Sequence, residues 1–141
     1  MTKLNPYLNF QGNTEEVFHF YRSVFGGEFT SLMRYRDMPG SEKMPETDSN
    51  KLMHVSLPIG ENIIMGTDIL DSRNQTLTMG DNFFISIAFD DEAETKRAFE
   101  GLSQGGTVIM PLNAESWSEL FGMLKDKYGV QWMFNYNKAD R

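Results

Sequence analysis

Few side chains in this sequence could perform acid–base, nucleophilic or metal chemistry. There is no cysteine, which excludes disulfides, thiol nucleophiles and zinc–thiolate sites. Of the two histidines, His19 lies in a helical pattern and is expected at the surface or its boundary. His54 lies in a strand pattern on the same face as Leu52 and Ser56, where it could act as an acid, base or donor, or make only a structural hydrogen bond. The histidines lack HExxH spacing, and no GxSxG, Walker or GxGxxG motif occurs.

The charge balance of the chain argues against two classes of partner. The formal net charge is −7, and Lys and Arg are scattered singly along the sequence. Proteins that bind nucleic acid or anionic membranes usually present a basic surface, so neither partner is expected. Residues 1–6 contain no apolar signal segment, and no apolar run approaches the length of a membrane span. We therefore expect a soluble, cytoplasmic protein.

The elements that must position these side chains occur twice along the chain. In each half a short apolar run ends in Phe, a polar cap follows, and an amphipathic helix leads to a Gly-Gly pair. The two copies are displaced by 79 positions, and their shared order of elements indicates an internal repeat. The matching residues are Phe10, Phe20, Gly26 and Gly27 in the first copy and Phe89, Phe99, Gly105 and Gly106 in the second.

The first copy is predicted to span residues 4–68. Asn13 is expected to cap the helix, with Glu16 in the capping-box position, and Gly26 with Gly27 is expected to end it. The buried helical face is predicted to contain Val17, Phe20, Tyr21, Val24 and Phe25. Strands are predicted over residues 4–10, 28–36, 51–57 and 63–68, and residues 37–50 are expected to form a long mobile loop.

The second copy is predicted to span residues 83–136, after a linker of residues 69–82. Asp90 or Asp91 is expected to cap its helix. Phe83, Ile85, Ile87 and Phe89 are predicted to share one strand face, and Ala98, Phe99 and Leu102 to point inward. A short strand at residues 107–110 is expected to end at Pro111, before a hairpin of residues 119–125 and 131–136. Residues 1–141 are thus predicted to form a single α+β domain of two β-α-β-β-β modules.

Several segments resemble the PhnB-like branch of the glyoxalase/bleomycin-resistance, or vicinal oxygen chelate, superfamily. The resemblance runs over residues 4–136, and the last motif is similar to a family Asp-Pro-Phe-Gly-His-x-Trp pattern, with Lys127 in place of Pro and Gln131 in place of His. The segments are residues 5–13 (NPYLNFQGN), 20–27 (FYRSVFGG), 51–57 (KLMHVSL), 64–68 (IMGTD) and 126–132 (DKYGVQW). The resemblance implies paired βαβββ modules whose strands curl into a cleft, and usually a homodimer.

The resemblance also implies where a metal would be bound in metal-dependent members. Their divalent ion is held by His or Gln, Glu, His and Glu from the first and last strands of each module. The corresponding positions here fall near Asn5 or Pro6 and at Met65, Phe84 and Met133. A neutral amide, thioethers and a phenyl ring are poor ligands for a catalytic divalent ion, because Met suits soft metals. We therefore expect no metal and no other cofactor.

If the strands curl as the resemblance implies, Met65, Phe84 and Met133 would converge into an apolar floor. Such a floor suits a partly apolar ligand oriented by a few polar groups, although plain core packing explains these three residues equally well. Trp117 could stack on the ligand, cover the core or contact a second copy. The full set of candidate pocket residues is Arg34, Tyr35, His54, Met65, Phe84, Glu115, Trp117 and Met133.

Three functions remain open from the sequence. The first is a metal-independent small-molecule-binding protein of the bleomycin-resistance kind. The second is a metal-dependent enzyme of the same superfamily, such as a lyase, isomerase or dioxygenase. The third is a structural dimer without a ligand. The residue types at the expected metal positions favour the first.

Overall fold

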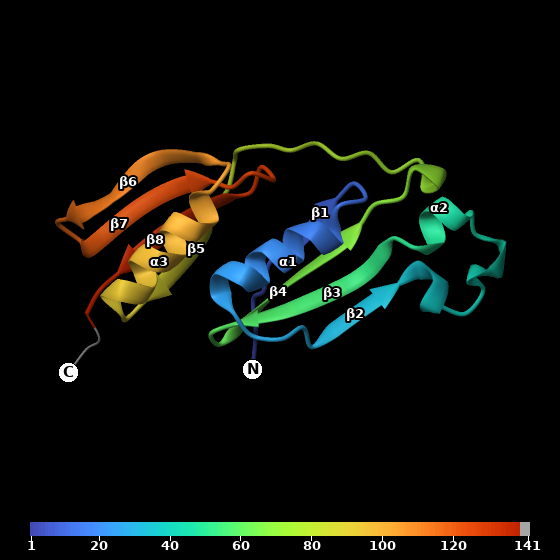
Figure 1. The fold of residues 1–141 in the computed structure, drawn as a ribbon, viewed down its shortest axis with the longest axis horizontal. Coiled ribbons are helices and arrows are strands. Elements are labelled where there is room, and N and C mark those ends of the chain that lie inside the picture. Colours follow the sequence, from blue (N-terminus) through green and yellow to red (C-terminus); the bar gives the residue numbers. More distant parts are fainter. Residues whose placement is uncertain (139–141) are drawn as a thin grey trace. The chain divides into compact units, whose positions relative to one another are not determined.

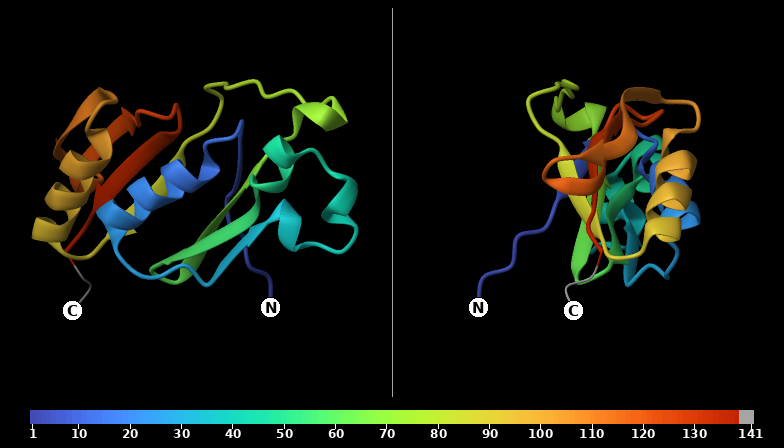
Figure 2. Two further views of the ribbon diagram at one scale, coloured as in Figure 1. Left: turned by 45° about the vertical axis from the view of Figure 1, so that its right-hand side comes forward. Right: turned by 90° about the vertical axis from the view of Figure 1, so that its left-hand side faces the viewer.

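The computed structural model describes residues 1–138, which form two compact units, Met1–Thr78 and a second unit that begins at Met79. Each unit places one long helix along one face of a four-stranded sheet (Figures 1 and 2). The first unit contains β1 (Tyr7–Phe10), α1 (Thr14–Phe25), β2 (Ser31–Arg34), β3 (Leu52–Ile59) and β4 (Asn62–Asp68). The second contains β5 (Ile85–Phe89), α3 (Glu92–Ser103), β6 (Thr107–Glu115), β7 (Ser118–Lys125) and β8 (Gln131–Tyr136).

The two sheets have the same topology. Their strand orders are β1-β4-β3-β2 and β5-β8-β7-β6. In each sheet the first strand pairs in parallel with the last, and the other pairs are antiparallel. This repetition confirms the prediction of two βαβββ modules in an α+β fold.

Helix α1 packs its apolar face on the first sheet. Val17, Phe18 and Tyr21 are fully buried, whereas Phe20 and Phe25 are only half-buried. The prediction was correct for Val17, Tyr21 and Val24 but wrong for Phe20 and Phe25, and it missed Phe18. Phe18 is buried because Gly66 of β4 has no side chain and leaves room for the Phe18 ring. His19 is exposed, as predicted.

The N-terminus of α1 is capped by a distant residue. Asn13 occupies the cap position but makes no side-chain capping bond, so the predicted capping box is not formed. Instead, Oδ1 of Asp68 accepts hydrogen bonds from the backbone N–H groups of Gly12 and Thr14, at 3.1 and 3.0 Å. A buried carboxylate from β4 thus satisfies the first N–H group of the helix, that of Thr14, and one N–H group of the preceding turn. The C-terminal prediction was correct, since Gly26 and Gly27 both adopt positive φ.

Short helices occupy much of residues 37–50, the segment expected to be a long loop, and the first of them begins at Tyr35, inside the predicted strand of residues 28–36. These are η1 (Tyr35–Asp37), η2 (Ser41–Lys43) and α2 (Glu46–Ser49), and η3 (Asp71–Arg73) follows in the predicted linker. The turns are closed by local hydrogen bonds, such as that from the Ser49 hydroxyl to the Glu46 carbonyl. Buried Asp48 faces the Lys51 ammonium at 3.5 Å, which ties the segment to the start of β3.

In the second unit, Phe134 of β8 joins the helix to the sheet. Its ring meets Phe99 of α3 edge-on and stacks on Phe89 of β5, with both centroid distances at 5.2 Å. Asp91 caps α3 by accepting a bond from the Glu94 N–H at 2.8 Å, and the buried residues Ala98, Phe99 and Leu102 confirm the predicted helix face. Phe83 departs from its prediction, because it lies before β5 and is 56% exposed.

Strand β6 continues beyond the position where it was expected to end. It runs through Pro111 to Glu115, at the edge of its sheet. Proline is tolerated there because the missing N–H group can face away from the neighbouring strand. The pairing of β6 with β7 is also irregular, with register shifts on both sides of Pro111. The expected stop at Pro111 was therefore wrong.

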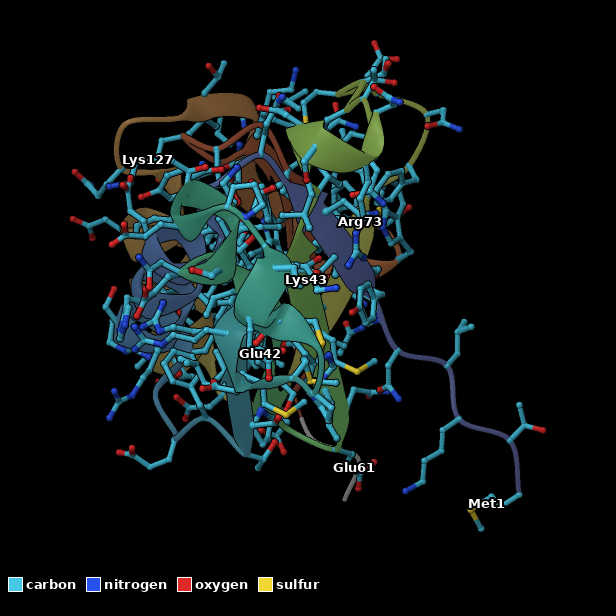
Figure 3. All side chains as sticks on the ribbon, turned by 90° about the vertical axis from the view of Figure 1, so that its right-hand side faces the viewer. Met1, Glu42, Lys43, Glu61, Arg73 and Lys127 are labelled. Atoms are coloured by element: carbon cyan, nitrogen blue, oxygen red, sulfur yellow. The ribbon has the colours of Figure 1, made fainter. Side chains whose placement is uncertain are left out.

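Charged side chains of both signs are exposed on the first unit, among them Glu42, Lys43 and Glu61 (Figure 3). Within residues 1–138, no helix has the length and apolar character needed to cross a membrane.

Candidate functional site

The face of the second sheet that points away from α3 carries a row of methionines. A Cβ built on Gly122 would lie 2.9 Å from the Phe99 ring, so Gly122 of β7 faces the helix and its neighbours Phe121 and Met123 face away. On β8, Phe134 contacts α3, which turns Met133 and Asn135 to the same opposite side. We call these four outward residues, Phe121, Met123, Met133 and Asn135, the methionine face.

The strand register brings the members of this face side by side. Met123 pairs with Met133, and Phe121 pairs with Asn135. Met110 of the edge strand pairs with Met123 and extends the row. On the other flank, Ser86 and Ala88 of β5 pair with Met133 and Asn135, so the neighbouring side chains there are small. The result is a largely apolar strip of thioethers and one phenyl ring that includes the amide of Asn135, with a second amide, Asn113 of the edge strand, beside Phe121.

The amide of Asn135 has an unusual environment. Its Oδ1 atom is buried, and within the part of the chain that the structure describes it has no hydrogen-bond partner. An unpaired buried acceptor costs free energy, so such atoms are rare in folded proteins.

Trp117 and Glu115 lie at the tip of the β6–β7 hairpin. The turn consists of Ser116 and Trp117, and Trp117 is 61% exposed. Its ring meets that of Phe121 edge-on, with 5.5 Å between centroids. Trp117 is therefore in contact with the methionine face through Phe121, and its role as a ligand contact stays a prediction. Glu115 is exposed beside it.

The corresponding face of the first sheet carries a tyrosine–histidine pair. Gly66 of β4 faces Phe18 of α1, so Met65 points to the opposite side, and its register partner Tyr7 of β1 shares that side. The Tyr7 hydroxyl lies 3.4 Å from Nδ1 of His54, and the ring centroids are 5.8 Å apart. Met33 of β2 pairs with His54 of β3. His54 is thus half-buried in a mixed polar and apolar surface rather than in the core.

Two predicted pocket residues make contacts on other parts of the first unit. Arg34 donates two hydrogen bonds to Glu15 of α1, at 3.0 and 2.8 Å, and a third to the Asn50 carbonyl. Tyr35 is buried, and its hydroxyl donates to the Asp68 carbonyl at 2.9 Å. Both side chains are engaged in holding α1 and β4, so they are not available to contact a ligand.

Arg34 and Glu15 also shift each other's pKa. The hydrogen bonds and charge of the Arg34 guanidinium lower the pKa of Glu15 from its usual value, although partial burial opposes this shift. In return, Glu15 raises the pKa of Arg34. The pair therefore stabilises the charged forms of both residues.

The three apolar positions expected to form one floor lie in different units. Met65 is half-buried on β4, Phe84 lies one residue before β5, and Met133 belongs to the methionine face. Their convergence stays a prediction. Among residues 1–138, no three His, Asp or Glu side chains are grouped as metal ligands.

Several residues of the candidate site were not predicted from the sequence. Asn135 could have been found from Met133, since residues two apart on a strand share a face. Phe121 and Met123 follow from the same alternation on β7. Met110 and Tyr7 could not have been found in this way, because their positions depend on pairing between distant strands.

These observations define a class: an α+β protein of two βαβββ modules, each with one sheet face free of its own helix, in the glyoxalase/bleomycin-resistance fold. A family model described as 3-demethylubiquinone-9 3-methyltransferase matches residues 2–134. The chain belongs to this family, the PhnB-like branch of the glyoxalase/bleomycin-resistance/dioxygenase superfamily.

Similar proteins agree with this assignment. Protein PA1353 from Pseudomonas aeruginosa is 32% identical, with a TM-score of 0.86 over 99% of this chain and 100% of that one. A putative 3-demethylubiquinone-9 3-methyltransferase, the PhnB protein from Bacillus cereus, is 31% identical, with a TM-score of 0.73 over 96% and 100%. Protein YjdN of Escherichia coli K12 is 28% identical over 96% of this chain and 95% of its own length.

A more distant structure supports the fold alone. A glyoxalase-related enzyme from Fulvimarina pelagi is 15% identical, with a TM-score of 0.66 over 97% of this chain and 88% of that one.

Proposed function

We propose that this protein binds a small, partly apolar molecule without the help of a metal ion, and that the methionine face carries the ligand. The observation behind the proposal is the row formed by Met133, Met123 and Met110, with Phe121 and Trp117 beside it. Methionine adapts its shape to a ligand and makes favourable contacts between its sulfur and aromatic rings. A structural surface would more often carry polar side chains on a sheet face without a helix.

The residue types at the expected metal positions support metal independence. Met65, Phe84 and Met133 offer thioethers and a phenyl ring in place of imidazole and carboxylate. Divalent ions of catalytic sites prefer nitrogen and oxygen ligands. The Tyr7–His54 pair supplies polar groups on the first unit that could orient a ligand or exchange a proton with it. These groups would act without a metal.

We further propose that the protein is a cytoplasmic homodimer. The resemblance to metal-free members implies a dimer, and the edge strand β6 exposes Val108 and Ile109. An exposed apolar edge strand can pair with a strand of another chain, which supports a dimer through this edge.

Tryptophan fluorescence tests the proposal directly. Trp117 is exposed beside the methionine face, whereas Trp132 is buried and donates its Nε1–H to Asp126 at 2.9 Å. Compounds that raise the melting temperature in a screen of antibiotics, glutathione conjugates and aromatic acids would be titrated while the emission is recorded. We expect a saturable change in tryptophan emission that disappears in the Trp117→Phe variant. Without a ligand, Trp117→Phe and Met133→Leu should have the same melting temperature as the unaltered protein.

Metal analysis separates the proposal from its main alternative. A metal-dependent enzyme of the superfamily would be purified with stoichiometric Zn, Ni, Mn or Fe, and chelation would abolish its ligand binding. We expect the same dissociation constant before and after EDTA treatment. If no compound shifts the melting temperature, a structural dimer is the better description. A shift with S-adenosylmethionine alone would instead favour the activity in the family model's description.

A further inference from the structure

The orphaned oxygen of Asn135 indicates what the ligand must carry. Asn135 lies between Phe121 on β7 and Ala88 on β5, in the row next to the methionines. Its Oδ1 atom is buried without a partner among the described residues, whereas the other amide of this face, Asn113 of β6, has no such buried atom. Folding has therefore placed one acceptor in a largely apolar strip without a hydrogen-bond partner from residues 1–138. A binding site that awaits a donor accounts for this arrangement.

The surroundings of Asn135 restrict the rest of the ligand. Phe121 and Met133 offer a ring and a thioether, both of which favour a planar aromatic partner. Along β7, the charged residues Glu119 and Lys125 share this side but lie at opposite ends of the strand. The middle of the face is uncharged, and a charged ligand group there would lose its hydration without compensation.

We infer that the ligand is an uncharged planar aromatic molecule with an N–H or O–H group, which donates a hydrogen bond to Oδ1 of Asn135. This inference rests on the proposed function, since it specifies the chemistry of the same face. The ligand reaches the shielded oxygen by displacing neighbouring side chains, and the unbranched side chains of Met123 and Met133 change rotamer readily. A site built to accept a hydrogen bond discriminates strongly against an analogue that lacks the donor.

Matched pairs of probes test the inference. Indole and 2-naphthol carry a donor, whereas 1-methylindole and 2-methoxynaphthalene have nearly the same aromatic surface without one. Each would be titrated into the full chain labelled with [methyl-13C]methionine, with the resonances of Met123 and Met133 assigned from Met→Leu variants. We expect the donor compounds to bind about tenfold more tightly than their methylated partners, which corresponds to one well-placed hydrogen bond.

Substitutions of Asn135 and Asn113 test which residue causes the preference for compounds with a donor. In Asn135→Leu the preference for donors should vanish, while the melting temperature should not fall, because the unpaired acceptor has been removed. In the control Asn113→Leu the preference should remain, since Asn113 pairs with Phe121 on the same face. Asn135→Ala replaces Asn135→Leu if the larger side chain prevents folding.

The outcomes are distinct. Equal affinity for both members of each pair would overturn the inference and leave the proposed function standing. A donor preference that persists in both Asn135 variants would also overturn it. Failure of all four probes to shift the methionine resonances at millimolar concentration would overturn the inference and the proposed ligand face together.

Discussion

The carboxylate of Asp68 connects three separate segments of the first unit. Oδ1 accepts hydrogen bonds from the backbone of Gly12 and from the backbone and hydroxyl of Thr14, and Oδ2 accepts one from the Leu52 N–H at 2.9 Å. Only 2% of the residue is exposed. One buried side chain thus fixes the turn after β1, the start of α1 and the start of β3 relative to one another.

Asp68→Asn should destabilise the first unit markedly. The amide has the same shape but replaces one acceptor oxygen with a donor, which would face N–H groups that it cannot satisfy. We expect a loss of about 1–3 kcal/mol in the free energy of unfolding, measured by circular dichroism in urea. Asp71→Asn is the control, because Asp71 is exposed and accepts one bond from Gln11. Equal effects of the two substitutions would contradict the role of Asp68.

Glu15 should give the first unit a pH-dependent contribution to stability. Its pKa is lowered in the folded protein, so the contribution is present above the usual value near 4.5 and is lost as the pH falls through the folded pKa. The side chain is 41% exposed, so at pH 7 Glu15→Gln should cost less than about 1 kcal/mol. The difference from the unaltered protein should shrink to zero in acid.

Urea unfolding at a series of pH values measures this effect. Glu94→Gln on α3 is the control, because its pair with Arg97 lies on an exposed helix surface, where little stabilisation is expected. A Glu15→Gln difference that stays constant from neutral to acidic pH would rule out the ion pair as its cause.

Each helix lies over a glycine in the sheet beneath it. A Cβ on Gly66 would lie 2.6 Å from Cε1 of Phe18 in α1, and one on Gly122 would lie 2.9 Å from Cε2 of Phe99 in α3. Side-chain atoms cannot approach so closely, so both glycines permit the close contact between helix and sheet. The two glycines lie on strands that do not correspond in the repeat, since Gly66 belongs to β4, the counterpart of β8, and Gly122 belongs to β7.

Gly66→Ala should therefore force α1 away from the sheet. We expect a loss of about 1–3 kcal/mol, as for other overpacked cores, measured by thermal or urea unfolding. Gly80→Ala is the matched control, since the nearest atom to its added Cβ is 3.8 Å away and its φ is not positive. The control should be neutral or slightly stabilising. An unaffected Gly66→Ala protein would show that Phe18 can move freely.

At the scale of elements, the sequence predicted what local patterns determine. Local residues determine the β3–β4 and β7–β8 hairpins, the cap at Asp91 and the end of α1 at Gly26 and Gly27. All of these features were predicted. The capping of α1 by Asp68 and the burial of Phe18 under Gly66 could not be predicted, because each joins residues about fifty positions apart. Strand β6 was cut short at Pro111 because the chain does not reveal locally that this strand lies at an edge.

At the scale of the whole molecule, we expect a native mass of roughly twice the 16.2 kDa of one chain. The resemblance implies a homodimer, and an uncovered edge strand invites association. Size-exclusion chromatography with light scattering over a range of concentrations measures the mass. A mass of one chain at all concentrations would contradict the dimer.

The candidate site shows the same division between local and distant information. Met133 and Trp117 were predicted from position and residue type, and alternation alone would have added Asn135 to the candidates. Arg34 and Tyr35 are polar groups near strands, but their contacts with Glu15 and Asp68 depend on how α1 and β4 pack. The lone acceptor of Asn135 could be recognised only once every neighbour was in place.

The methionine row has a consequence for cells under oxidative stress. Peroxide converts a thioether into a sulfoxide, a polar and chiral group that would disrupt an apolar surface. Met110 is the exposed end of the row, so it would react before the half-buried Met123 and Met133. The chain has no cysteine to react first, so under the proposed function oxidation of these methionines would weaken ligand binding, and sulfoxide reductases would restore it.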